Sequence, residues 1–162
     1  MNDIFLVGPS YCGKTALSEI LQKTFNYEVV HVGELVRKIC SEKGTETPVL
    51  LDSETLCGVI AGQLRPLQYY IIDNAFKTVS QMEACFKQWE SLNRDWHIIW
   101  IVDKRTNVDF TARGRADDSQ IQSKRELWKQ NEAQMLTELK EKYPGSFTIV
   151  ENTDFGFYFK KE

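Results

Sequence analysis

The hydrophobic positions of this chain form short apolar runs that alternate with stretches of helical periodicity. The apolar runs predict strands over residues 3–8, 27–31, 68–73, 97–102 and 146–150. Apolar residues spaced three and four apart predict helices over residues 14–24, 34–43, 53–63, 78–93 and 119–142. This alternation predicts a single α/β domain over residues 1–162, with a five-stranded parallel sheet and helices on both faces.

The first predicted strand leads directly into a segment with the pattern of a phosphate-binding loop. It reads Gly8-Pro9-Ser10-Tyr11-Cys12-Gly13-Lys14-Thr15, which contains the P-loop motif Gly-x4-Gly-Lys-Thr. The glycines let backbone N–H groups approach phosphate oxygens, Lys14 adds a positive charge, and the Thr15 hydroxyl can ligate Mg²⁺. The following helix turns its positive dipole end toward the same anion. An ordinary glycine-rich turn is the alternative interpretation.

The loop predicts a nucleotide site. The residues expected to bind ATP are Gly8, Ser10, Tyr11, Cys12, Gly13, Lys14, Thr15 and Ala16.

Further motifs follow the next predicted strands, at the sheet edge where such folds bind ligands. The second strand is followed by His31-Val32-Gly33-Glu34-Leu35-Val36-Arg37, and the third by Asp73-Asn74-Ala75-Phe76-Lys77-Thr78-Val79-Ser80-Gln81. The fourth is followed by Ala112-Arg113-Gly114-Arg115-Ala116-Asp117-Asp118, before a helix that carries Arg125. Over roughly residues 3–142 these motifs resemble those of the adenylate kinases and, more broadly, the nucleoside monophosphate kinases.

The resemblance implies a P-loop NTPase fold of three layers, with a nucleoside monophosphate-binding segment over about residues 32–64 and a short lid over about residues 105–118. It implies ATP and a nucleoside monophosphate, AMP above all, as substrates and Mg²⁺ as the cofactor. The implied catalytic residues are Lys14, Asp73, Arg113, Arg115 and Arg125. The implied AMP-binding residues are Gly33, Arg37, Lys77 and Gln81, with Gln81 reading the adenine. Thr15 and Asp73 are the implied metal residues, the aspartate acting directly or through water.

The same residues also have structural explanations. Arg37 precedes Lys38 on a predicted helix, where a solvated surface charge is common. Thr78 and Gln81 have the spacing of a capping box. Arg125 shares an apolar helical stripe with Trp128, and an arginine in such a stripe usually has an anionic partner. Asp117 and Gln120 fit a helix cap as well as a lid.

Several positions depart from the adenylate kinase pattern. Lys77 stands where the family has an arginine, and a lysine lacks the bidentate fork of a guanidinium. Asn74-Ala75-Phe76 replaces Gly-Phe-Pro, Ser10-Tyr11 replaces Pro-Gly, and Asp109 replaces an arginine. The family's last helix has no counterpart, and the tail Phe155-Gly156-Phe157-Tyr158-Phe159 is an aromatic cluster that would either pack on the sheet or dock on a protein partner.

The composition of the chain argues against some classes of binding partner. The net charge of −3 and the pI of about 5.5 argue against nucleic acid and against an anionic membrane surface. The four cysteines have neither CxxC nor Cys/His ligand spacing, which indicates reduced thiols. With no signal peptide or spanning segment in the sequence, the expected location is the cytoplasm.

Three hypotheses remain open at this point. The first is an active nucleoside monophosphate kinase that converts ATP and AMP to two ADP. The second is a weakened nucleotide-binding module that serves mainly within a larger assembly, which the Lys77, Asn74 and Asp109 departures favour. The third is another small P-loop kinase, for gluconate- or shikimate-type acceptors, or a plain ATPase. Arg37 and Gln81 favour a nucleotide acceptor over the third.

Overall fold

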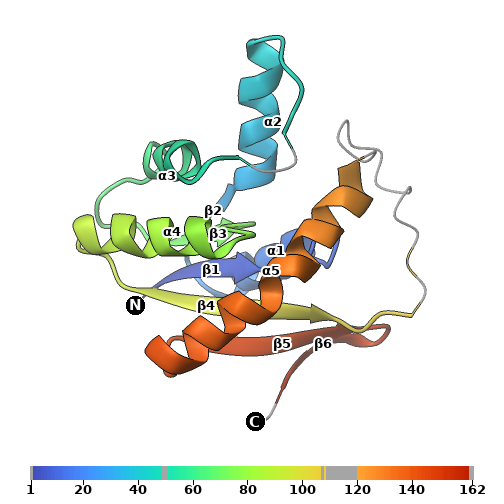
Figure 1. Ribbon diagram of the computed structural model, residues 1–162. Coiled ribbons are helices and arrows are strands. Elements are labelled where there is room, and N and C mark those ends of the chain that lie inside the picture. Colours follow the sequence, from blue (N-terminus) through green and yellow to red (C-terminus); the bar gives the residue numbers. More distant parts are fainter. Residues whose placement is uncertain (1, 49–50, 107, 109–119, 161–162) are drawn as a thin grey trace.

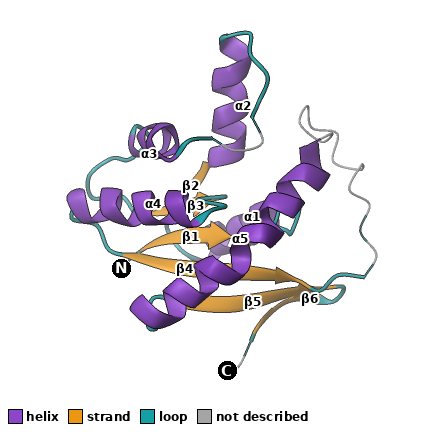
Figure 2. Ribbon diagram, viewed as in Figure 1, coloured by secondary structure: helices purple, strands orange, loops and turns teal. Residues whose placement is uncertain are grey.

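The computed structural model describes residues 2–48, 51–106, 108 and 120–160. In these residues a six-stranded sheet is covered by helices on both faces (Figures 1 and 2). The strands are β1 (Asp3–Val7), β2 (Glu28–His31), β3 (Tyr70–Asp73), β4 (Trp96–Asp103), β5 (Phe147–Thr153) and β6 (Gly156–Phe159). The helices are α1 (Lys14–Thr24), α2 (Val32–Glu42), α3 (Ser53–Ala61), α4 (Val79–Ser91) and α5 (Ile121–Lys142).

The strand order is β2-β3-β1-β4-β5-β6, and the first five strands run parallel, as the sequence predicts. The prediction of five strands in total is wrong, because β6 adds an antiparallel strand to β5. The chain reverses between Thr153 and Gly156, where the glycine has a φ of +125° that other residues rarely adopt. The Thr153 hydroxyl donates a hydrogen bond to the Gly156 carbonyl across this turn (3.0 Å).

Alternation of side chains along the central strand β1 divides the core between the two faces. Phe5 and Val7 belong to the larger cluster, which α3, α4 and α5 cover with residues such as Trp89 and Met135. Leu6 belongs to the smaller cluster, to which α1 contributes Leu17 and Leu21. Both faces of β1 are therefore buried, as expected for the middle of a parallel sheet.

The aromatic tail splits its side chains between the core and the surface. Phe157 on β6 packs against the smaller cluster, which includes Cys12 and Leu17. Phe155, Tyr158 and Phe159 are exposed, with 89%, 54% and 76% of their surfaces accessible. Phe157 thus agrees with the interpretation that the tail packs on the sheet. Docking of the exposed aromatic residues on a protein partner stays a prediction.

The end of the sheet opposite the phosphate loop is fixed by a buried carboxylate. Asp3, which is 1% exposed, accepts hydrogen bonds from Arg94 Nε (2.7 Å), Arg94 Nη2 (2.9 Å), Trp89 Nε1 (2.8 Å) and the Tyr70 backbone N–H (2.8 Å). Arg94 also donates to the Gln68 carbonyl. These bonds join β1, β3, the end of α4 and the entrance of β4 at one point.

α2 stands out from the sheet, with α3 between it and α4 (Figure 1). The loop that follows α2 contacts the start of α5, because the Gln120 side-chain amide donates to the Thr47 carbonyl (2.7 Å). No helix in the described part of the chain is both long and apolar enough to cross a membrane.

Candidate functional site

The phosphate loop connects β1 to α1, and Lys14 is the first residue of that helix. The Lys14 ammonium donates to the carbonyl oxygens of Pro9 (2.7 Å) and Gly8 (3.1 Å), so the side chain folds back over the loop. The helix has no side-chain cap and no acidic residue in its first turn. Its N-terminal N–H groups are therefore not satisfied by a capping side chain, which is the arrangement that binds phosphate in other helices.

Close packing explains the two glycines of the motif. A Cβ on Gly8 would lie 2.7 Å from Cys12 Sγ and 3.1 Å from the Ile101 carbonyl oxygen. A Cβ on Gly13 would lie 2.7 Å from the Asn152 amide nitrogen, and its φ of +96° is strained for any other residue. Tyr11, where the resembling family has a glycine, also has a positive φ, of +62°.

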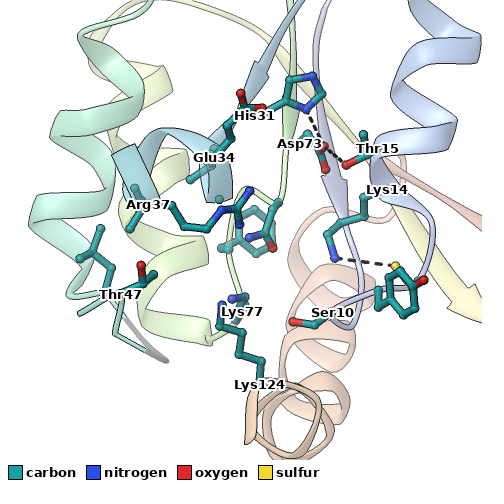
Figure 3. Close-up of a pocket in the computed structure, with 18 of the residues that line it drawn as sticks. Ser10, Lys14, Thr15, His31, Glu34, Arg37, Thr47, Asp73, Lys77 and Lys124 are labelled. Atoms are coloured by element: carbon teal, nitrogen blue, oxygen red, sulfur yellow. Dashed lines mark hydrogen bonds and ion pairs between the residues drawn. The ribbon is translucent and has the colours of Figure 1, made fainter. Parts of the chain in front are cut away.

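The Thr15 hydroxyl and the Asp73 carboxylate meet beside the loop (Figure 3). Thr15 Oγ1 donates to Asp73 Oδ2 over 2.9 Å, and Asp73 is 4% exposed. β2 and β3 pair with His31 opposite Asp73, and His31 Nδ1 contacts the same carboxylate oxygen at 2.9 Å. Hydroxyl and carboxylate oxygens are the donors that Mg²⁺ prefers, usually with one or two protein ligands and the rest from water and phosphate. Thr15 and Asp73 therefore fit the implied metal.

The two histidines of the chain should titrate on opposite sides of the ordinary pKa. The hydrogen bond with Asp73 raises the pKa of His31 above 6.5, against partial burial, whereas burial lowers the pKa of His97 below 6.5. His31 thus stabilises the fold fully below about pH 6.5 and loses this contribution as the pH rises through its folded pKa. His97 acts in the opposite sense, and its contribution is lost as the pH falls through its folded pKa.

An NMR titration of the imidazole protons tests this pair. We expect one resonance to titrate above pH 6.5 and the other below it, with His97→Asn removing the lower one. Asp73→Asn should bring the upper pKa down while leaving the His97 titration in place. Two resonances that both titrate below 6.5 would contradict the His31–Asp73 contact.

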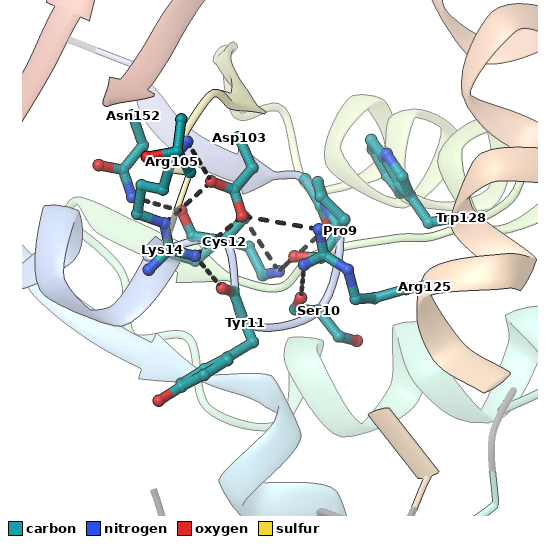
Figure 4. A network of polar contacts seen from close by, with 12 residues as sticks. Pro9, Ser10, Tyr11, Cys12, Lys14, Asp103, Arg105, Arg125, Trp128 and Asn152 are labelled. Carbon is teal, nitrogen blue, oxygen red and sulfur yellow. Dashed lines mark hydrogen bonds and ion pairs between the residues drawn. The ribbon is translucent and has the colours of Figure 1, made fainter. Parts of the chain in front are cut away.

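A second polar network lies beneath the loop (Figure 4). No motif in the sequence indicates this network. Asp103, at the end of β4, accepts bonds from Arg105 Nε (2.9 Å) and Nη2 (2.8 Å) and pairs with Arg125 Nη2 at 3.6 Å. Arg105 and Arg125 also donate to the loop carbonyls of Tyr11 and Ser10. Burial would raise the pKa of Asp103, but the hydrogen bonds from Arg105 and the charges of both arginines hold it below its ordinary value.

In this structure Arg125 pairs with the Asp103 side chain, an anion of the kind expected for an arginine in an apolar stripe. Its catalytic role stays a prediction. The strand-end rule that selected Asp73 would also have selected Asp103, which directly follows the apolar residues Ile98–Val102 of β4.

The β5–β6 hairpin supports the loop from the other side. The Asn152 side-chain amide donates to the Cys12 carbonyl (2.9 Å), and the Phe157 ring would be 3.2 Å from a Cβ on Gly13. The Asp154 carboxylate accepts from the Thr106 backbone N–H (3.0 Å) and hydroxyl. The hairpin therefore contacts both the phosphate loop and Thr106, near the start of the predicted lid.

A cavity of about 490 Å³ extends from the phosphate loop to α2, α4 and α5 (Figure 3). Lys14, Thr15 and Asp73 lie at its loop side, and Arg37, Lys77 and Lys124 contribute cations from the other elements. Apolar residues in its lining are Val32, Val36, Leu51, Leu56 and Phe76. Gly33 and Gln81 also line it, so the described residues of the predicted AMP site are brought together. Lys124 was not among the residues singled out in the sequence.

The Gln81 amide is engaged in local structure. Its oxygen accepts from the Lys77 backbone N–H (2.8 Å), and its nitrogen donates to the Leu51 carbonyl (2.6 Å). The Gln81 backbone N–H donates to Thr78 Oγ1 (3.2 Å), which caps α4. This geometry agrees with the capping interpretation, and it fixes the position of the loop that carries Lys77.

Asn74, at the position where the adenylate kinase pattern has a glycine, adopts a left-handed backbone conformation. Its φ is +68°, and asparagine tolerates this left-handed region better than other residues with a side chain. Asn74→Ala should lower the free energy of unfolding by about 1 kcal/mol, whereas Asn74→Gly should change it by less than about 0.5 kcal/mol. Urea unfolding of the two variants measures the difference. Equal midpoints for alanine and glycine would contradict the assigned conformation.

Of the predicted lid over residues 105–118, the structure describes residues 105, 106 and 108. The undescribed part includes Asp109, Arg113, Arg115 and Asp117, so the lid and its catalytic arginines stay predictions.

The structure resembles the crystal structure of a gluconokinase from Sinorhizobium meliloti 1021. The TM-score is 0.57, the sequence identity is 14%, and the match covers 93% of this chain and 82% of the gluconokinase chain. At this identity the likeness shows a shared fold, an α/β fold like that of a P-loop kinase. No protein-family model and no curated protein sequence matches this chain.

Proposed function

We propose that the protein is a nucleoside monophosphate kinase that transfers the γ-phosphoryl group of ATP to AMP. The observation that carries the proposal is that the phosphate loop and a second group of cations line one cavity, whose lining is partly apolar. Lys14 lies on the donor side, and Arg37 and Lys77 lie on the acceptor side. Because phosphoryl transfer depends on positioning and charge neutralisation, two sets of cations around one cavity suit two phosphorylated substrates.

The apolar part of the lining favours an acceptor that carries a base. The apolar lining residues Val36, Leu51 and Leu56 belong to or flank the helices of the segment over residues 32–64. Phe76, which follows β3, lines the same cavity. A base can pack on such side chains, whereas a small sugar acid presents hydroxyls that need polar partners.

Mg²⁺ held by Thr15 and Asp73 would neutralise charge on the phosphates of ATP during transfer. The protein's own groups would bind the phosphates of the two substrates. Lys14 and the N–H groups at the start of α1 would hold the donor phosphates, and Arg37 would hold the acceptor phosphate.

A smaller acceptor that presents a hydroxyl is the second candidate. Two observations favour it: both polar atoms of the Gln81 side chain are already hydrogen-bonded within the protein, and a solved structure with the same fold is a gluconokinase. In this case the phosphate-loop side of the cavity would keep its role and the acceptor side would bind a sugar acid.

A coupled assay of ADP formation from Mg-ATP distinguishes the candidates. The acceptors are AMP, CMP, UMP, GMP, gluconate and shikimate, each with an EDTA control. Strong stimulation by AMP supports the proposal, and stimulation by gluconate or shikimate alone supports the second candidate. ATP binding without stimulation by any acceptor would leave a nucleotide-binding module with no transferase activity toward these compounds.

A further inference from the structure

We propose that Asn152 is a positioning residue of the phosphate loop. By holding the Cys12 carbonyl, it turns the Gly13 N–H toward the cavity, where this N–H donates to the phosphate chain of the donor nucleotide. The inference rests on the proposed function and deepens it, because it names a residue outside the loop motif on which binding of the donor phosphates depends.

Asn152 occupies an apolar position of its strand. It is 7% exposed, and it lies two residues after Val150, on the same face of β5. Val150 belongs to the smaller apolar cluster with Cys12 and Leu17. An amide buried on such a face is unfavourable unless it is hydrogen-bonded, and the Asn152 amide donates to the Cys12 carbonyl over 2.9 Å. The contact with the loop thus explains a polar side chain at this place.

This hydrogen bond fixes the orientation of one peptide group in the loop (Figure 4). The peptide between Cys12 and Gly13 is trans, so its carbonyl and its N–H point in opposite directions. The carbonyl points to Asn152, which lies outside the lining of the cavity, whereas Cys12, Gly13 and Lys14 belong to that lining. The Gly13 N–H is therefore turned to the cavity side at the start of α1. Backbone N–H groups presented in this way form anion-binding concavities.

Neighbouring strand ends hold successive carbonyls of the loop. Asp103 on β4 pairs in register with Asn152 on β5. Asp103 accepts two hydrogen bonds from Arg105, which in turn donates to the Tyr11 carbonyl. Asn152 donates to the next carbonyl along the loop, directly and without a charge. A neutral substitution of Asn152 therefore tests the orientation of one peptide without removing a charge from the site.

The Asn152 side chain is itself held in place. The Asn152 carbonyl accepts from the Lys104 N–H (2.7 Å), and Asn152 pairs in register with Phe157 on β6. A Cβ on Gly13 would lie 2.7 Å from Asn152 Nδ2 and 3.2 Å from the Phe157 ring. The amide is thus packed against the glycine whose N–H it orients. A donor that is fixed before the ligand arrives costs little to organise on binding.

The first test compares Asn152→Leu with Thr153→Val. Leucine has a similar volume and no donor. The control removes a hydroxyl that bonds only within the turn of the same hairpin, to the Gly156 carbonyl (3.0 Å) and from the Phe155 N–H (3.1 Å), in the part of the chain that the structure describes. Calorimetric titration with diphosphate and with ATP, in EDTA, measures binding by the loop without Mg²⁺.

We expect Asn152→Leu to bind both ligands about 10-fold more weakly, which corresponds to about 1.4 kcal/mol, because the Cys12 carbonyl is no longer held. Thr153→Val should keep the wild-type affinities. Both variants lose hydrogen bonds and can unfold at lower urea concentration. Lower stability alone does not weaken binding while nearly all of the protein is folded, because affinity depends on the fraction of competent molecules.

The Gly13 amide provides a measurement that a purely structural role would not change. In ¹⁵N-labelled wild-type protein its resonance should shift when diphosphate is added, whereas the resonance of Gly145, at the other end of β5, should stay in place. In Asn152→Leu the Gly13 shift at saturation should be smaller, because the peptide is no longer oriented toward the anion.

The results that overturn the inference are wild-type affinities in Asn152→Leu, equal losses in Asn152→Leu and Thr153→Val, a Gly13 resonance that does not respond to diphosphate, or a wild-type protein that binds neither ligand. If Asn152→Leu binds both ligands more weakly but no acceptor stimulates turnover of the wild type, the inference stands and only the proposed transfer to AMP fails. Circular dichroism shows whether Asn152→Leu folds. If it does not, Asn152→Asp, which keeps the shape and has no donor at neutral pH, is titrated instead, and wild-type affinities would overturn the inference.

Discussion

Lys14→Met is expected to reduce phosphoryl transfer by at least about 100-fold while leaving the fold intact. Loss of one preorganised charge at a transferring group typically costs a factor of about 100 to 1,000 in kcat. In the structure the Lys14 ammonium already rests on the Pro9 and Gly8 carbonyls at the rim of the cavity, so it can move to a phosphate without rebuilding the loop. Initial rates of ADP formation with the best acceptor measure the effect.

The matched control is Lys23→Met, which removes an exposed lysine from the last turn of the same helix. Its rate should equal that of the wild type, and the urea midpoints of both variants should stay near the wild-type value. A Lys14→Met protein that folds and retains its rate would show that this loop does not handle the donor phosphates.

Asp3→Ala is expected to lower the free energy of unfolding by about 3–5 kcal/mol, which is the usual effect of leaving a buried partner charge uncompensated. Arg94 would lose its carboxylate while 16% of its side chain remains exposed, and Trp89 Nε1 and the Tyr70 N–H would lose their acceptor. Natural domains have only about 5–15 kcal/mol of stability in total. The variant should therefore unfold at much lower urea concentration, with a melting temperature lower by about 10 °C.

Asp95→Ala is the control, because Asp95 is exposed and lies next to the same strand end. Its unfolding free energy should change by less than about 0.5 kcal/mol. The Asp3→Ala and Arg94→Met changes should be strongly non-additive when they are combined, because both remove the same pair. Additive effects would mean that the Asp3–Arg94 contact contributes little.

The sequence predicted the parallel part of the fold because each core strand is an apolar run with a clear polar boundary. The sequence pattern did not predict β6 as a strand. It is four residues long and begins at Gly156, and its aromatic side chains do not alternate with polar ones. Only the pairing with β5, which no periodicity reveals, makes it a strand.

The site was predictable to the extent that its chemistry is local in sequence. Gly8 to Thr15 form one continuous motif, and Asp73 is marked by its place after a strand. The roles of Lys124, Asp103 and Asn152 depend on which way a helix or strand faces after folding. The Asn152 amide, for example, donates to the carbonyl of Cys12, which lies 140 positions earlier in the chain. For Gln81 the pattern allowed two roles, and the observed hydrogen bonds favour the structural one.

The hairpin that supports the phosphate loop has a consequence for the order in which the chain folds. The loop is among the first residues to be synthesised, whereas Asn152 and Phe157, which hold its Cys12 and Gly13, are made some 140 residues later. Contacts so distant in sequence form slowly, because the entropic cost of closing a long loop comes before the contacts can stabilise the chain. If the proposed function holds, the nascent protein should be unable to bind ATP tightly until β5 and β6 have joined the sheet, so that nucleotide binding would indicate that the fold is complete.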